Sequence, residues 1–142
     1  EILTDFLLSE RCLLEKLHLG SNGITDRGAN SLSNMLKKNR SLTHLMLNRN
    51  SIGNAGVHLL SSVLTVENRS LLVLSLSFNS LITDQSIDSF IVMLKQNSTL
   101  KGLDLKCCNI SEGNNQRLRR TVETKERFEL FTNPVDTSCS IS

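Results

Sequence analysis

The chain has 142 residues, a formal net charge of +2 and 39% hydrophobic residues, a size that suits one compact domain or a short repeat array. So small a charge gives no electrostatic case for nucleic acid, and the absence of Trp and Tyr leaves little aromatic surface for a flat cofactor. No apolar run reaches the roughly 20 residues that span a bilayer, so we expect no nucleic-acid partner, no cofactor and no membrane span.

Residues 1–13 begin the chain with Leu3, Phe6 and Leu7, which have the spacing of one helix face. The same spacing recurs later in the chain, before each of several short leucine-rich segments. We therefore expect residues 1–13 to be the end of a preceding repeat, and the chain to be a fragment of a longer protein.

Four segments share the pattern L-x-x-L-x-L-x-x-[N/C]-x-[I/L]. They begin at Leu14, Leu42, Leu71 and Leu100, which lie 28, 29 and 29 residues apart. Leucines at the first, fourth and sixth positions would point inward and stack on their counterparts in the next repeat, because no single repeat can bury its apolar face alone.

This pattern resembles the leucine-rich-repeat family, and its period resembles the ribonuclease-inhibitor-like class found in NOD-like receptors, tropomodulins and Ran GTPase-activating proteins. The resemblance implies a right-handed α/β solenoid, with parallel strands on the concave face and helices on the convex face. The resemblance covers about residues 1–131, of which we take residues 14–131 as the repeat array with a degenerate C-terminal cap. It further implies a ladder at the ninth position, where asparagines hydrogen-bond backbone groups of neighbouring turns: Asn22, Asn50 and Asn79, with Cys108 as a structural thiol in the fourth repeat.

The second half of each repeat has helical spacing of apolar residues. These residues are Ala29, Leu32, Met35 and Leu36, then Val57, Leu60, Val63 and Leu64, then Ile87, Phe90, Met93 and Leu94. Thr25/Asp26 and Thr83/Asp84 supply side-chain oxygens where the first and third helices begin, so we expect them to cap those helices.

The helices are expected to end at Asn39, Asn68 and Asn97, since Asn tolerates the left-handed conformation of a C-cap. The same three residues, and Asn109, also begin formal N-glycosylation sequons. Because three sequons share one repeat position, repeat structure explains them without a glycan.

At the C-terminal end, residues 128–131 follow Leu100 by one repeat length and predict a degenerate fifth strand. Pro134 would block further strand pairing. Residues 132–142 are small and polar, and we expect a disordered tail.

A partner is expected on the concave face, where the non-leucine strand positions point outward. Register places there a mixed apolar and cationic patch, typical of a protein interface; its residues are His44, Met46, Arg49, Val73 and Phe78. For Phe78 a second interpretation stays open, in which the ring packs into the core beside the asparagine ladder.

No catalytic motif or phosphate-binding glycine loop is present in the sequence. His18 and His44 should lie on the same face without a third ligand nearby, so we expect no metal site. The four cysteines do not follow the repeat, which favours free thiols in a reducing compartment and, with the repeat class, a cytoplasmic location.

The sequence therefore favours a non-catalytic protein–protein interaction module of a larger intracellular protein, with the sensing region of a NOD-like receptor as its setting. A regulator of a small GTPase resembling Ran GTPase-activating proteins is an alternative, although the tail lacks their acidic segment. A second alternative is a tropomodulin-like cytoskeletal binder, although no actin-binding helix is apparent in the sequence.

Overall fold

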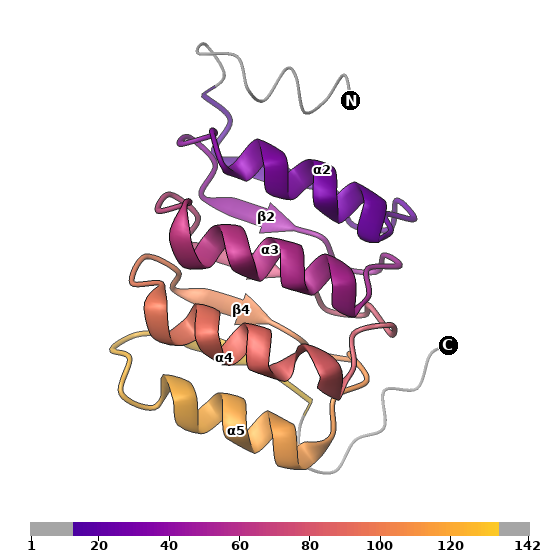
Figure 1. The fold of residues 1–142 in the computed structure, drawn as a ribbon, viewed down its shortest axis with the longest axis vertical. Coiled ribbons are helices and arrows are strands. Elements are labelled where there is room, and N and C mark those ends of the chain that lie inside the picture. Colours follow the sequence, from indigo (N-terminus) through magenta and orange to yellow (C-terminus); the bar gives the residue numbers. More distant parts are fainter. Residues whose placement is uncertain (1–12, 134–142) are drawn as a thin grey trace.

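The computed structural model describes residues 13–133, which form a solenoid of alternating strands and helices (Figure 1). The elements in chain order are β1 (Lys16–His18), α2 (Asp26–Leu36), β2 (His44–Met46), α3 (Asn54–Val66), β3 (Val73–Ser75), η1 (Asp84–Ser86), α4 (Ile87–Gln96), β4 (Gly102–Asp104), α5 (Glu112–Val122) and β5 (Glu129–Phe131). In Figure 1 the helices lie side by side in one layer, in front of the strands. The predicted α/β repeat solenoid is confirmed.

The strands form one parallel sheet in the order β1-β2-β3-β4-β5, so every strand pairs with the strand of the next repeat. The central residue of each strand is a leucine, and these leucines stand in register across the whole sheet: Leu17, Leu45, Leu74, Leu103 and Leu130. Because side chains alternate along a strand, the leucines face the helices while their neighbours face outward.

Helices α2, α3 and α4 bury the apolar positions that the helical spacing predicted. Ala29 and Leu36 of α2, Val57 and Leu64 of α3, and Phe90 of α4 are each fully buried. They pack with the strand leucines into one continuous core, which no single turn could form by itself.

Helix starts are capped differently from the sequence prediction. Thr25 makes no side-chain capping bond to α2. Asp26 instead accepts hydrogen bonds from the backbone N–H groups of Gly53 (2.7 Å) and Gly56 (2.9 Å), at the start of α3 in the next turn. A Cβ atom on Gly56 would lie 2.6 Å from the Asp26 carboxylate, so glycine is needed for this close approach.

The third repeat combines both kinds of cap. Thr83 accepts from the N–H of Gln85 (3.4 Å), as predicted. Asp84 reaches forward and accepts from the N–H of Ser111 (2.8 Å), which precedes α5. Asn54 makes the equivalent forward contact from α3, by accepting from the N–H of Thr83 (2.9 Å). These side chains therefore join consecutive turns as well as capping helices.

The asparagine ladder lies at the carboxyl ends of the strands. The amide nitrogen of Asn50 donates to the carbonyls of Leu19 (2.9 Å) and Leu47 (3.0 Å), and its oxygen accepts from the N–H of Ile24 (2.9 Å). Asn79 repeats this arrangement one turn later, with 0% exposure. Cys108 keeps only a weak bond, from its thiol to the carbonyl of Leu76 (3.4 Å).

A second asparagine ladder lies at the amino ends of the strands, where the helices were predicted to end in left-handed caps. Asn39, Asn68 and Asn97 are buried, and none has a positive φ, so the predicted left-handed C-caps are wrong. Asn68 donates to the carbonyl of Leu36 in the preceding turn (2.9 Å), while its oxygen accepts from the N–H groups of Ser70 (3.1 Å) and Leu71 (3.0 Å). Because these three sequon asparagines are buried, the folded structure has no room for a glycan on them, whereas Asn109 is exposed.

Two expectations for the chain ends lie largely outside the described residues: the preceding helix in residues 1–13 and the disordered tail in residues 132–142. Within residues 13–133 no helix is both long and apolar enough to cross a bilayer. Free thiols were expected throughout, and this is wrong for Cys107, which is disulfide-bonded. Cys108 is a free, buried thiol.

Candidate binding face on the concave side

The concave face is built from the outward positions of the strands, and strand register decides which side chains become neighbours. His44 of β2 lies beside Val73 of β3, and Met46 lies beside Ser75. All but Ser75 are partly exposed, so they present a surface that is apolar at Met46 and Val73 and polar at His44. The His44 Nδ1 atom lies 2.9 Å from the hydroxyl of Thr43, which holds the imidazole in place.

Arg49 and Phe78 occupy the same position in consecutive turns, just after the strands. The guanidinium carbon of Arg49 lies 4.6 Å from the centre of the Phe78 ring, a cation–π stack. Both residues have left-handed backbones, with φ of 56° and 58°. The Phe78 ring is 39% exposed, so the interpretation that packed it into the core is wrong.

The left-handed backbone recurs at this position in four turns, at Ser21, Arg49, Phe78 and Cys107. Non-glycine residues adopt this conformation at a cost of about 1 kcal/mol, so the surrounding turn must enforce it. The sequence pattern gave no warning, because none of these residues is Gly, Asn or Asp. The left-handed backbone conformation fixes the direction in which the Arg49 and Phe78 side chains leave the turn.

The five residues of the predicted patch thus lie on two adjacent strands and on the turns that follow them. His44 and Val73 form one neighbouring pair by register, and Arg49 and Phe78 form another by stacking. We call this surface, defined by His44, Met46, Arg49, Val73 and Phe78, the concave patch.

Next to the concave patch lies a polar cluster that no sequence motif predicted. Ser75 donates to the carboxylate of Asp104 (3.1 Å), and the hydroxyl of Ser77 lies 3.3 Å from that of Ser75. The Lys106 ammonium lies 4.8 Å from the centre of the Phe131 ring. Register alone could have placed Ser75 beside Asp104, although the hydrogen bond depends on side-chain rotamers.

The described residues contain no group of three or more His, Cys, Asp or Glu that could hold a metal ion. Among the described residues, the Cys108 thiol has a strongly altered acidity, since burial raises its pKa to about 12. A thiol with such a pKa stays protonated at neutral pH and is a poor nucleophile. The concave patch itself offers apolar, aromatic and guanidinium surface.

A family model described as Leucine Rich repeat matches residues 12–33, 38–61, 67–90 and 96–112, which is more than half of the chain. Human NACHT, LRR and PYD domains-containing protein 5 is 53% identical over 58 residues, covering 41% of this chain and 5% of the relative. Protein 3 of the same series from rat is 32% identical over 105 residues, and human protein 14 is 36% identical over 108. Each match covers 74% of this chain and 10% of the relative.

The chain therefore spans a tenth or less of the length of these curated relatives. Among solved structures, the actin-binding site 2 of leiomodin-1 superposes with a TM-score of 0.79, covering 94% of this chain and 78% of that chain. At 15% identity this likeness shows the fold alone. The repeat period, the parallel sheet and the matched family model together show that this chain belongs to the leucine-rich-repeat family, with relatives among the NACHT, LRR and PYD domains-containing proteins.

Proposed function

We propose that this leucine-rich-repeat module takes a protein partner on its concave patch, as part of the sensing region of a NOD-like receptor. The observation that carries the proposal is the Arg49–Phe78 stack, an exposed aromatic ring and a guanidinium held in fixed directions by two strained turns. Aromatic and Arg side chains are the residues that most often dominate protein interfaces.

The partner's chemistry follows from the composition of the concave patch. Met46, Val73 and the Phe78 ring would accept an apolar side chain, because each leaves apolar surface in contact with water. Stacking on the ring leaves the edge of the Arg49 guanidinium open to a carboxylate, which it binds in a bidentate way. A partner segment with an apolar anchor next to an Asp or Glu fits this surface.

The test is affinity capture with the full-length parent protein and with its Met46→Glu/Phe78→Glu variant, read by mass spectrometry. A matched control, Gln116→Glu, places a negative charge on the exposed side of α5, away from the concave patch. A partner that is retained by the parent and the control but lost by the folded double variant supports the proposal. Identical partner lists for the parent and the double variant would remove the concave patch as the binding surface.

A non-enzymatic role is part of this proposal, and the described residues contain no group of three or more His, Cys, Asp or Glu that could hold a metal ion. The GTPase-regulator and tropomodulin-like alternatives stay open as predictions, and no feature of the structure favours either. The leiomodin-1 structure is described as an actin-binding site, and that likeness supports a shared fold only.

A cytoplasmic location also belongs to the proposal and has its own test. Disulfides are rare in the cytosol, so the bonded state of Cys107 counts against this location. Alkylation of the protein inside intact cells, followed by mass spectrometry, reports whether Cys107 carries a free thiol. A reduced Cys107 supports the cytoplasm, and an oxidised one contradicts it.

A further inference from the structure

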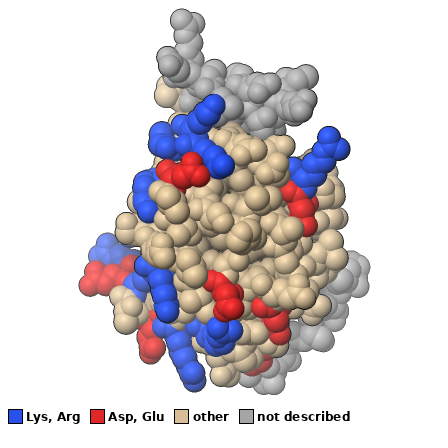
Figure 2. Space-filling model, viewed as in Figure 1, with Lys and Arg blue, Asp and Glu red and all other residues tan. Residues whose placement is uncertain are grey.

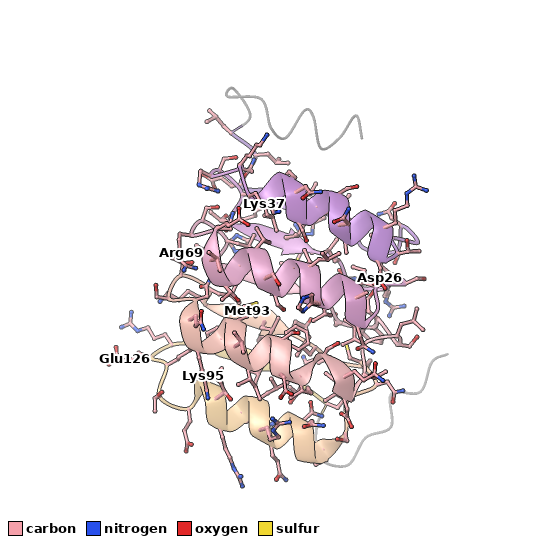
Figure 3. All side chains as sticks on the ribbon, in the orientation of Figure 1. Asp26, Lys37, Arg69, Met93, Lys95 and Glu126 are labelled. Carbon is pink, nitrogen blue, oxygen red and sulfur yellow. The ribbon has the colours of Figure 1, made fainter. Side chains whose placement is uncertain are left out.

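The convex face pairs its own charges. Figure 2 shows the charged side chains around the margin of this face, with a broad uncharged surface in the middle. The ammonium of Lys37, at the edge where the helices end (Figure 3), lies 3.9 Å from the carboxylate of Glu67. The guanidinium of Arg117 lies 2.9 Å from the carboxylate of Asp88. These charges therefore have partners within the chain.

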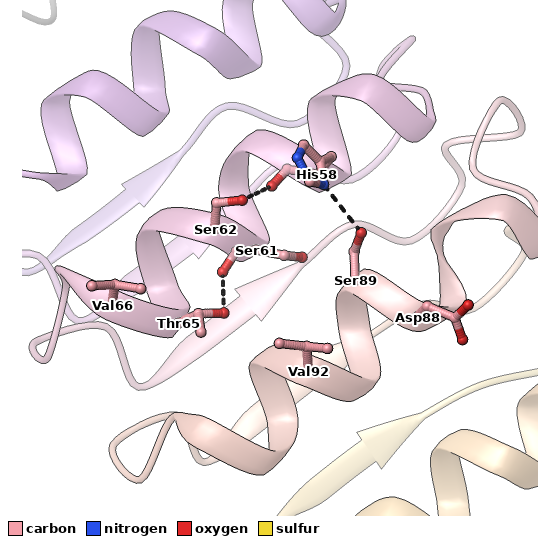
Figure 4. A pocket seen from close by; sticks show the side chains of 8 residues that line it. All are labelled: His58, Ser61, Ser62, Thr65, Val66, Asp88, Ser89 and Val92. Atoms are coloured by element: carbon pink, nitrogen blue, oxygen red, sulfur yellow. Dashed lines mark hydrogen bonds between the residues drawn. The ribbon is translucent and has the colours of Figure 1, made fainter.

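A hollow of about 370 Å³ lies between α3 and α4 on the same face (Figure 4). The Nδ1 atom of His58 lies 3.4 Å from the hydroxyl of Ser89. The hydroxyls of Ser62 and Thr65 donate to backbone carbonyls of their own helix, at 2.8 and 2.7 Å. These polar groups are likewise already hydrogen-bonded within the chain.

The concave face differs, because its charged side chains lack partners of opposite charge. Lys16 of β1 and Arg49 after β2 make one end of this face positive. Asp104 of β4 and Glu129 of β5 carry negative charge toward the other end. None of these four side chains forms an ion pair with another residue of the described range 13–133. A ligand on this face meets charges of opposite sign at its two ends.

Gly102 of β4 leaves a notch on the concave face, between Val73 of β3 and Glu129 of β5. The register across these three strands is unbroken and Gly102 has no positive φ, so neither a bulge nor a left-handed turn demands glycine here. A Cβ atom at Gly102 would lie 3.5 Å from its nearest neighbour, the Cγ2 atom of Val73, which is ordinary van der Waals contact. A glycine inside a strand weakens the strand, and it often marks a site that a ligand approaches closely.

The walls of the notch suit a long cationic side chain. The methyl groups of Val73 form an apolar wall, and Asp104 lies two positions beyond Gly102 on the same face. The Ser75 hydroxyl and the Lys106 backbone N–H, each 3.1 Å away, hold the Asp104 carboxylate in place without neutralising it. Asp104 and the next strand's glutamate occupy diagonal positions, about 8 Å apart at ordinary strand spacing, so one cation can contact both.

Two lysines lie near the notch and are directed elsewhere. The ammonium of Lys106 lies 4.8 Å from the centre of the Phe131 ring. Lys101 borders a separate hollow together with Lys125. Neither Lys101 nor Lys106 forms an ion pair with a described carboxylate, so both carboxylates at the notch stay available to a cation from another molecule.

We propose that the notch over Gly102 binds a Lys or Arg side chain of an extended partner segment that lies across the concave face. This inference rests on the proposed concave patch, with which the notch shares Val73. An acidic residue of the segment meets Arg49 and its basic residue meets Asp104 and Glu129, so the charges fix the direction of the segment across the strands. At about 4.8 Å between strands and about 3.3 Å per residue, the two charged residues of the segment are about five positions apart.

The test is selection of a phage-displayed library of random peptides on the 142-residue chain. Selected peptides should carry Lys or Arg about five positions from Asp or Glu. Replacing that Lys or Arg by Ala should weaken binding several-fold, measured by isothermal titration calorimetry. Glu129→Lys should weaken the same peptides by a similar factor, and a peptide with Glu in place of its Lys should bind this variant better than it binds the parent.

The matched control is Glu126→Lys, which makes the same charge change outside the concave face. Figure 3 shows Glu126 on the side of Arg69, at the edge where the helices end. This variant should bind the selected peptides as the parent does. An equal loss of binding for Glu126→Lys and Glu129→Lys would reduce the effect to overall charge and would overturn the notch.

Gly102→Ala and Gly102→Val test the notch itself. Because a Cβ atom fits at this position, the unfolding temperature of Gly102→Ala should stay the same or rise. Binding of the selected peptides should nevertheless fall several-fold, and it should fall further for Gly102→Val, because the new side chain occupies the space of the partner's side chain. Thermal unfolding followed by circular dichroism verifies that both variants are folded.

Failure of the notch and failure of the concave patch give different results. Peptides that are lost on Met46→Glu/Phe78→Glu, but show no preference for Lys or Arg and ignore Gly102→Val, would overturn the notch and leave the concave patch intact. Selection of no peptide, or of peptides that bind Met46→Glu/Phe78→Glu as well as the parent, would overturn the concave patch and the notch together.

Discussion

The interior turn around α3 and β3 and the last turn around α5 and β5 both pair a helix with a strand of the same sheet, but they are held together by different interactions. In the interior turn, Leu74 is 1% exposed and α3 buries seven residues. In the last turn, Leu130 is only partly buried, and α5 buries just Asn115 and Leu118.

Polar contacts follow the same contrast. Interior turns are joined by buried asparagine amides, which donate and accept at once. In the last turn Lys125 takes the equivalent place, donating to the carbonyl of Asn97 (2.9 Å), and a lysine can accept nothing. Arg119 closes this turn with bonds to Glu112 (2.7 Å) and Thr132 (2.8 Å). Partly exposed hydrogen bonds and an ion pair therefore stabilise the last turn, whereas buried leucines and asparagines stabilise the interior turn.

The largest difference in stability between the two turns is expected when the central leucine of each strand is replaced by alanine. Leu74→Ala should lower the free energy of unfolding by about 4 kcal/mol, because it leaves a cavity in a closed core. Leu130→Ala should cost only about 1 kcal/mol, since water already reaches part of that side chain. Urea unfolding of both variants measures the difference. Equal losses would show that the last turn is as tightly packed as the interior.

The second largest effect on the free energy of unfolding is expected in the second asparagine ladder. Asn68→Ala should lower the free energy of unfolding by about 3 kcal/mol, because it strands buried carbonyl and N–H groups on two turns. Lys125→Ala should cost less than about 1 kcal/mol, as its partner carbonyl can turn to water. Asn30→Ala, on the exposed side of α2, is the matched control and should be neutral. A neutral Asn68→Ala would contradict the role of the second ladder.

The replacement of asparagine by Cys108 predicts a pH dependence. Burial raises the pKa of this thiol from 9.0 to about 12, so the unfolded chain loses its proton first. Its contribution to stability is complete below pH 9.0 and is lost as the pH rises toward 12. Unfolding free energies of the parent and Cys108→Ser should therefore fall with different slopes above pH 9.0. Parallel slopes would mean that the thiol is less buried than the structure shows.

The smallest difference in stability is expected between Asp26 and Asp84, the two carboxylates that accept hydrogen bonds from the following turn. Asp26→Ala removes two bonds to α3 and should cost about 1 to 2 kcal/mol, whereas Asp84→Ala removes one exposed bond before α5 and should cost less. The hydrogen bond from Ser111 lowers the pKa of Asp84 below 3.8, so its contribution is present above that pH and is lost as the pH falls further. Thermal unfolding at several acidic pH values, beside Asp84→Asn, measures this. A larger loss for Asp84→Ala than for Asp26→Ala would reverse the expected order.

The leucine pattern predicted the strands, the helices and the outward direction of the concave patch, because a regular spacing translates directly into a face. The same reasoning failed for Asn39, Asn68 and Asn97. Local rules suggested helix caps, while the side-chain amides of Asn68 and Asn97 donate to carbonyls in the preceding turn, about 30 residues away in the chain. It also left the position of Phe78 open, since a ring at that site can face either way until the φ of the turn is known.

For this protein the sequence by itself determined the repeat, its period and the identity of the core leucines, since these depend only on spacing and hydrophobicity. Tertiary structure alone decided which side chains meet across turns: Arg49 on Phe78, Asp26 on the start of α3, and Asn68 on the carbonyl of Leu36. The physical reason is that each of these contacts joins residues one repeat apart. Neither partner's local sequence specifies such a contact until the turns have stacked.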